Sequence, residues 1–288
     1  MDLDVFASLA VNGIAYGMVL FLIAAGMSLI MGIMGITNMA HGAVYMLGGY
    51  VGWTFVFQLQ LSFWLGAVVA GLVGGAVGLC IERLFLRKLY KQPNEQLILT
   101  FGFVYIITNI CIWIWTGRAR IPFSDPSLKF TVDIGGVSFA MTRFVIIIVG
   151  VGVLFLLWWI QEKTKIGAQV KAGMDDKEMT KGLGINLEKI QMLVFFVASF
   201  IAGFAGTIGA QLIGVTSEMG TGMFLIAIIV IIVGGVGSVQ GAVLGAIIIG
   251  LTDAFTKAYL PQFSMFSMYV AMIIILVVRP RGLLGREL

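Results

Sequence analysis

The sequence has 288 residues, of which 60% are hydrophobic and only 11% are charged, with a formal net charge of +4 and a mean hydropathy of +1.05. Soluble domains carry roughly 25% charged residues, so a soluble globular protein is excluded. Because the apolar segments are too long and too numerous for a globular core, the composition indicates one helical domain, residues 1–288, that crosses a membrane several times.

Apolar segments of membrane-spanning length recur along the whole chain. A bilayer core of about 30 Å needs roughly 20 apolar residues per helix. We therefore predict an all-α fold with nine spans, near residues 6–31, 41–60, 62–81, 97–116, 143–161, 190–213, 220–235, 238–257 and 264–278. Gly-x-x-x-Gly pairs, which place two glycines on one helix face and favour close helix packing, are Gly13 and Gly17, Gly48 and Gly52, Gly71 and Gly75, Gly74 and Gly78, and Gly241 and Gly245.

The stretch GITNMAHGAVYMLGGYVG, residues 35–52, interrupts an apolar run with glycines and with the only histidine of the chain. Glycine disfavours a helix by about 1 kcal/mol relative to alanine, so we predict a broken helix here. Transporters place such breaks beside the substrate path. The candidate pathway residues of this stretch are Thr37, Asn38, His41 and Tyr45. The alternatives are a helix cap for Asn38, a structural hydrogen bond for His41 and simple packing for Tyr45.

Groups that could power transport are missing from the sequence. Between Val5 and Ile81 there is no Asp, Glu, Lys or Arg, and the carboxylates at membrane depth are limited to positions near span ends, such as Glu218 and Asp253. Proton-driven carriers need a titratable group inside the membrane. There is also no Gly-x-x-x-x-Gly-Lys-Ser/Thr loop to bind ATP phosphates, and no catalytic or metal-binding constellation. We therefore expect no enzyme activity, catalytic residue, metal or cofactor in this chain.

The segment 162–189, EKTKIGAQVKAGMDDKEMTKGLGINLEK, is the longest hydrophilic loop on the side that we assign to the cytoplasm. Acidic residues at 175–178, a lysine at 181 and the glycines beyond it are start and stop signals of a short helix. One interpretation is a solvated connector. The other is a coupling helix that docks on an ATPase, because active transport by this chain needs an external source of energy.

A second helix break is predicted further along the chain. The run 215–250 is so continuously apolar that Gly234–Gly235 is its only plausible interruption. HGAV (41–44) and QGAV (240–243) follow Gly35 and Gly234 at equal distances, which suggests a faint internal repeat. Ser238 and Gln240 are therefore further candidate pathway residues.

Lysine and arginine residues give the predicted orientation. They cluster at 83–91, at 163–189 and at 279–286. Cytoplasmic loops are enriched in these residues, and nine spans place all three clusters on the same side. We therefore predict an N-terminus outside and a cytoplasmic C-terminus. The positive net charge follows from this topology and does not indicate nucleic-acid binding.

Four blocks of the sequence resemble the branched-chain amino acid ABC transporter permease family, of the leucine–isoleucine–valine permease type. The blocks are GMSLIMGIMGITNMAHGAVYMLGGYVG (26–52), KIGAQVKAGMDDKEMTKGLGINLEKIQMLVFFVASFIAGFAGTIGA (165–210), MFLIAIIVIIVGGVGSVQGAVLGAIIIGL (223–251) and RPRGLLG (279–285). They occur in order over nearly the whole chain, and the first and the last are specific to the family.

The resemblance implies a permease subunit of an importer in a bacterial inner membrane. Its expected partners are a second related permease, two ATP-binding subunits that use ATP and Mg, a periplasmic binding protein and the lipid bilayer. By analogy, the residues that contact the ATPase are Lys171, Ala172, Asp175, Asp176, Lys177, Glu178 and Lys181. The family commonly has Arg-Ala where this chain has Lys171–Ala172, and lysine lacks the planar fork of arginine.

Several functions stay open at this point. The transported solute is expected to be a branched-chain or related amino acid, and urea, short amides and aromatic acids are alternatives within the same class of importer. A stand-alone secondary carrier or channel is disfavoured by the missing intramembrane carboxylates. A non-transporting membrane scaffold would explain the glycine packing but not the polar break.

Overall fold

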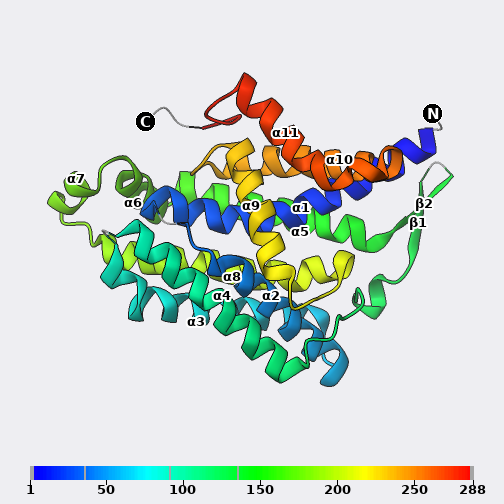
Figure 1. The fold of residues 1–288 in the computed structure, drawn as a ribbon, viewed down its shortest axis with the longest axis horizontal. Helices are drawn as coiled ribbons and strands as arrows, with labels where there is room; N and C mark the ends of the chain where they lie inside the picture. Colours follow the sequence, from blue (N-terminus) through cyan, green and yellow to red (C-terminus); the bar gives the residue numbers. More distant parts are fainter. Residues whose placement is uncertain (1–2, 36, 91, 135, 286–288) are drawn as a thin grey trace.

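The computed structural model describes residues 3–35, 37–90, 92–134 and 136–285. They form a bundle of helices that is elongated in the view of Figure 1. The helices are α1 (Leu3–Met34), α2 (Ala40–Trp53), α3 (Phe63–Leu84), α4 (Pro93–Trp115), α5 (Met141–Lys163), α6 (Lys165–Asp175), α7 (Lys177–Gly182), α8 (Leu187–Ile213), α9 (Met219–Gly234), α10 (Val239–Tyr259) and α11 (Ser264–Val278). A π-helical turn, Thr54–Gln58, continues α2.

Each predicted span falls on one of these helices. By length and composition, seven helices of the described residues can cross a membrane: α1, α3, α4, α5, α8, α10 and α11, the last together with the turn before it. The remaining two predicted spans correspond to α2, with 14 residues, and α9, with 16. As α-helices, both are shorter than the roughly 20 residues that a bilayer core requires, and the π-helical turn extends α2 to Gln58. The chain is therefore an all-α, polytopic membrane protein, with two short helices in its interior.

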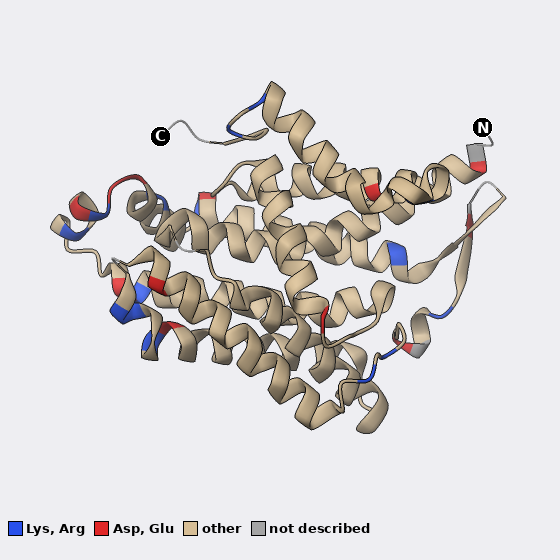
Figure 2. Cartoon of the chain, viewed as in Figure 1, with Lys and Arg blue, Asp and Glu red and all other residues tan. Residues whose placement is uncertain are grey.

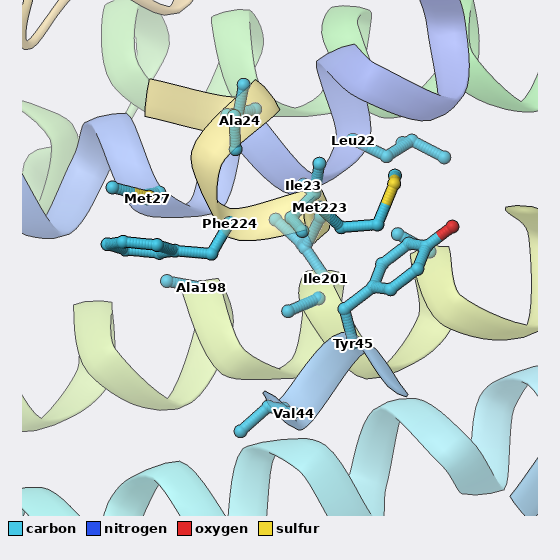
Figure 3. Packing of buried hydrophobic residues seen from close by; sticks show 14 of the residues in the cluster. Leu22, Ile23, Ala24, Met27, Val44, Tyr45, Ala198, Ile201, Met223 and Phe224 are labelled. Atoms are coloured by element: carbon cyan, nitrogen blue, oxygen red, sulfur yellow. The ribbon is translucent and has the colours of Figure 1, made fainter. Parts of the chain in front are cut away.

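The core is built around α1 and α8. Leu20, Phe21 and Leu22 of α1 have no exposed surface, and Phe195 and Ala202 of α8 are equally buried. A helix that is apolar on all sides is stable only when it is surrounded, and α1 is surrounded by α8, α9, α10 and α5. Figure 3 shows side chains of α1, α2, α8 and α9 meeting in this core.

The outer helices leave large apolar side chains exposed. Trp113 of α4 is 85% exposed, and Met265 and Val277 of α11 are 81% and 77% exposed. Such surfaces are expected where a protein faces lipid or another membrane subunit. Figure 2 shows a matching distribution of charge, since most charged residues lie near the ends of the helices and in the loops.

The predicted glycine contacts are confirmed. A Cβ atom on Gly17 would lie 2.7 Å from the carbonyl oxygen of Ala246 on α10, and one on Gly74 would lie 2.7 Å from that of Ser199 on α8. Gly206 of α8 is tighter still, because its Cβ would lie 1.9 Å from the carbonyl oxygen of Tyr45. Side chains larger than hydrogen would separate these backbones, so the glycines permit the close packing of α1, α2, α3, α8 and α10.

Among the described residues, a small β-hairpin departs from the predicted all-α pattern. Strands β1 (Thr131–Ile134) and β2 (Val137–Ala140) pair antiparallel, with Thr131 opposite Ala140. The β-branched residues of both strands favour this conformation. The hairpin leads into α5, and Figure 1 places it at the end of the bundle opposite α6 and α7.

Candidate functional site

The first break returns the chain into the bundle. Helix α1 ends at Met34, and Gly35 adopts a left-handed φ of 69°. After the break, Nε2 of His41 donates a hydrogen bond to the carbonyl oxygen of Ile23, at 3.1 Å. Ile23 lies about three helical turns, or roughly 16 Å, before the end of α1. Helix α2 therefore begins deep inside the bundle rather than at its surface.

The backbone freed by this break finds partners within the protein. The amide of Met39 donates to Oγ1 of Thr100 at 3.3 Å, and the amide of Ala40 donates to Oδ1 of Asn38 at 3.1 Å. Asn38 is 1% exposed. Its side chain thus binds an amide at the start of α2, as expected if Asn38 has a structural role rather than a role in lining the pathway. The N-cap position itself is occupied by Met39. These bonds meet the requirement that irregular backbone at membrane depth be satisfied by protein.

Some polar atoms close to this break have no such partner. Among the described residues, Nδ1 of His41 and the hydroxyl groups of Tyr45 and Ser28 are buried without a hydrogen bond. Figure 3 shows Tyr45 amid the apolar side chains of the core. Thr37 is half-buried. Unpaired buried polar atoms are uncommon in folded proteins and call for an explanation.

The second break lies where the sequence predicts it. Helix α9 ends at Gly234, and Gly235 and Gly237 follow with φ of 106° and 78°. Oγ of Ser238 accepts a hydrogen bond from the amide of Gly241 at 2.9 Å and so caps α10. Gln240 is exposed. Ser238 and Gln240 line a cavity of about 410 Å³ together with Lys171, and the lining of this cavity does not include Asn38 or His41.

The C-terminal segment closes the end of α9. The amide of Leu283 donates to the carbonyl oxygen of Val233, and the amide of Leu284 donates to that of Gly234, both at 2.9 Å. These carbonyl groups belong to the last turn of α9, and the carbonyl groups of a last helical turn have no amide partner within the helix. In the sequence, segment 279–285 stands out by its basic residues and by its family resemblance, whereas a long-range backbone pairing of this kind leaves no local signal.

The loop 162–189 contains two helices rather than the one predicted. The predicted helix is α7, where Oδ1 of Asp176 accepts hydrogen bonds from the amides of Glu178 and Met179 at 2.9 and 3.0 Å. The preceding segment forms α6, whose start is capped by Thr164. The predicted helix signals of residues 175–184 describe α7 well but contain no information on α6.

The predicted coupling residues lie mainly on the surface of this loop. Asp175, Asp176, Lys177, Glu178 and Lys181 are exposed, and Ala172 is half-buried. Lys171 pairs with Glu162 at 2.5 Å. Two apolar side chains that the sequence analysis passed over are also exposed, Met179 at 66% and Leu183 at 69%.

The same loop contacts both helix breaks. The methyl carbon of Met174 lies against Gly32, where a Cβ atom would be 2.7 Å away, and against Gly237, where it would be 3.2 Å away. Nζ of Lys177 donates to the carbonyl oxygen of Met34 at 3.4 Å. A cavity of about 700 Å³ lies at this junction, lined among others by Gly35, Met174 and Gly237. Movement of α6 and α7 would therefore reach the end of α1 and the second break together.

Asp253 and Glu82 are buried carboxylates, and each has a polar partner. Asp253 is 5% exposed and pairs with Lys257 at 2.7 Å. Glu82, which the sequence analysis did not single out, is 1% exposed and accepts a hydrogen bond from the hydroxyl of Tyr90. Burial and this bond raise the pKa of Tyr90 above its ordinary value. The described residues include no group of three or more His, Cys, Asp or Glu that could hold a metal ion.

Comparisons with known proteins match nearly the whole chain. Residues 9–278 match the family model described as the branched-chain amino acid transport system permease component. The high-affinity branched-chain amino acid transport system permease protein LivH of Escherichia coli strain K12 is 30% identical over 290 residues, which cover 96% of this chain and 94% of LivH. The permease protein BraD of Pseudomonas aeruginosa is 30% identical with the same coverage.

A second related permease and a solved structure also match. LivM of Salmonella typhimurium is 25% identical over 93% of this chain and 68% of LivM. A chain of the structure of PsaBC from Streptococcus pneumoniae in complex with Fab superposes with a TM-score of 0.52 and 13% identity, over 93% of this chain and 89% of that chain, and it shares the fold. The family match and the two breaks in their expected places lead to one conclusion: this chain belongs to the family of branched-chain amino acid transport system permease components.

Proposed function

We propose that this chain is the permease subunit of an ABC importer that carries branched-chain or related amino acids. The relatives LivH and BraD are named for that transport and align over 96% of this chain. The single observation in the structure that supports coupled transport best is the contact of the loop 162–189 with both helix breaks, through Met174 and Lys177.

The partners follow from the same comparison. Escherichia coli has both LivH and LivM, and this chain is similar to each. We therefore propose that the chain pairs with a second, related permease and takes the place of LivH, whose length it matches more closely. Two ATP-binding subunits that use ATP and Mg, and a periplasmic binding protein, complete the proposed assembly in a bacterial inner membrane.

The proposed topology has nine spans, with α2 and α9 as the two short ones. Its N-terminus lies outside and its C-terminus lies in the cytoplasm. The clusters of Lys and Arg in the loop 162–189 and after α3 support this orientation. In this arrangement the loop faces the ATP-binding subunits and the β-hairpin faces outward.

We propose that the first break serves the translocation path. Asn38 holds its shape, while Thr37, His41 and Tyr45 present polar atoms to the solute once the break rearranges. The unpaired Nδ1 of His41 and hydroxyl of Tyr45 support this role, because a second conformation would give them partners. Ser238 and Gln240 would line the cytoplasmic end of the path.

The proposed coupling element is the loop 162–189. Met179 and Leu183 present apolar side chains to a groove of the ATP-binding subunit, and Asp175, Asp176, Glu178 and Lys181 surround them with charge. Ala172 lies behind this surface, and Lys171 is paired with Glu162. Closure of the ATP-binding subunits would push α7 and α6, and Met174 would pass the movement to both breaks.

Reconstitution of the complete assembly in proteoliposomes tests this function. We expect uptake of labelled leucine that requires ATP and the binding protein. Met174→Ala should keep ATP hydrolysis but lower the leucine taken up per ATP, whereas Met272→Ala, a half-buried methionine on α11, should leave this ratio unchanged. Uptake by this chain alone under an ion gradient would contradict the proposal and favour a secondary carrier. Uptake of urea or short amides instead of leucine would assign the importer to another solute.

A further inference from the structure

A cavity of about 260 Å³ lies beside the β-hairpin, at the end of the bundle opposite α6 and α7. It is formed by the loop before the hairpin, the start of α5 and the last turn of α8. Its polar lining includes Ser124, Lys129, Thr142, Arg143 and Gln211. Phe123 and Phe130 contribute apolar surface. Cations and apolar groups therefore border the same small space.

The cations that line the cavity form no salt bridge within the described part of the chain. Arg143 donates from Nε to Oδ1 of Asn12 at 2.9 Å and from Nη1 to Oγ1 of Thr142 at 3.4 Å, and Nη2 has no hydrogen bond to the described part of the chain. In the same described residues, no carboxylate forms a salt bridge with Arg143 or Lys129. The start of α5 adds the positive end of a helix dipole, and no side chain caps it. Bonds to Asn12 and Thr142 fix the guanidinium without neutralising it.

Gln211 is the second unusual feature of this lining. Its side chain is 6% exposed, yet neither its amide oxygen nor its amide nitrogen has a hydrogen-bond partner among the described residues. A buried amide normally has such partners. A guest with both donor and acceptor groups would supply them, and the amide oxygen could accept from an ammonium group.

We propose that this cavity is an outer binding site for a small solute that carries a carboxylate next to an apolar side chain. Arg143 holds the carboxylate, Gln211 pairs with the remaining polar group, and Phe123 and Phe130 face the apolar part. The inference rests on the proposed function, because it assumes that solute enters from this side. It deepens that function by favouring amino acids over urea and neutral amides, which have no carboxylate to offer Arg143.

The test uses the complete assembly in proteoliposomes, with labelled leucine as the probe and the binding protein at saturating concentration. Arg143→Gln should lower the uptake rate by about tenfold, since hydrogen bonds to a charged group are roughly twice as strong as neutral ones. Arg143→Lys, which keeps the charge, should lose less. The matched control is Arg118→Gln, an exposed arginine in the loop before the hairpin that is outside the cavity lining, and it should have no effect. Basal ATP hydrolysis reports that each assembly is intact.

Two further measurements separate the outcomes. Labelled leucine should bind directly to the wild-type assembly without the binding protein, and Arg143→Gln should abolish this binding. This binding test does not require uptake, so it can support the site even where a failure of wild-type uptake contradicts the proposed function. The affinity of the leucine-loaded binding protein for the assembly should not change. A loss of that affinity in Arg143→Gln would mean that the cavity receives an acidic side chain of the binding protein, which would overturn the solute site. Normal uptake by both Arg143→Gln and Gln211→Leu would also overturn it.

Discussion

The two helix breaks solve the same problem in different ways. At the first, the freed backbone is satisfied by side chains of the surrounding core, namely Asn38 and Thr100, and α2 is held at depth by the bond from His41 to Ile23. At the second, the end of α9 is satisfied by the backbone of a distant segment, Leu283 and Leu284. The first break can rearrange only if the core moves, whereas the second can open when one strip of chain is released. Two similar helix breaks can therefore differ greatly in the free energy that is needed to open them.

The largest loss of stability is expected from a substitution where α2 packs on α9. A Cβ atom at Gly42 would lie 2.0 Å from the carbonyl oxygen of Gly220, so Gly42→Ala should push α2 out of place. Overpacking of this kind costs roughly 1–3 kcal/mol. Thermal unfolding of the purified protein in detergent should show a clear loss of stability.

The matched control for this change is Gly222→Ala on α9, where an added Cβ meets no atom within 4 Å. It should leave the unfolding temperature near that of the wild type. Equal stability of both variants would show that the close approach of α2 and α9 is not a feature of the folded protein.

The bond from His41 to Ile23 offers a narrower way to disturb the first break. His41→Phe keeps most of the volume but removes the second hydrogen bond on the carbonyl oxygen of Ile23, which keeps its bond within α1, and should cost about 0.5–1.5 kcal/mol. Hydrogen exchange measured by mass spectrometry should become faster at residues 39–41 and remain unchanged at 235–238. Faster exchange at both breaks would mean that they open together.

The second break should respond to the loss of a single amide. Leu284→Pro removes the N–H group that binds the carbonyl oxygen of Gly234, with an expected cost of about 0.5–1.5 kcal/mol. Exchange should become faster at 235–238 and not at 39–41, the reverse of the result for His41→Phe. Leu284→Ala keeps the amide and should behave like the wild type.

The smallest effect on global stability is expected at the start of α7, because the loss is confined to one short helix. Asp176→Ala removes the cap of α7 and should cost about 1 kcal/mol of local stability. Exchange within 177–182 should increase, and uptake should fall without loss of the folded protein. Asp176→Asn retains a capping oxygen and serves as the control, so an equal increase in exchange for both variants would argue against the cap.

Local patterns in the sequence predicted much of the fold. Apolar runs located the helices, the pair Gly234–Gly235 located the second break, and the acidic residues near 176 located α7. Each of these signals lies within a few residues of the feature that it predicts. The same holds for the glycine pairs, whose spacing alone indicated a close-packed face.

Features that depend on distant contacts could not be predicted. The depth of α2 follows from His41 and Ile23, the closure of α9 from Leu283 and Leu284, and the link between loop and breaks from Met174. None of these pairings leaves a periodic pattern. The candidate pathway residues illustrate the limit, since the sequence did not indicate that Ser238 lines a cavity with Lys171, a lining that does not include Asn38.

The order in which the chain is synthesised determines when the end of α9 can close. Val233 and Gly234 emerge from the ribosome some fifty residues before Leu283 and Leu284, the groups that bind their carbonyl oxygens. At roughly 5–20 residues per second, these carbonyl groups wait for about 3–10 s. During that interval α9 is made but unfinished, and water or the insertion machinery has to solvate its end. The end of α9 is thus completed by a segment made about fifty residues later, and a chain stalled between the two would keep α9 open however well its other helices had inserted.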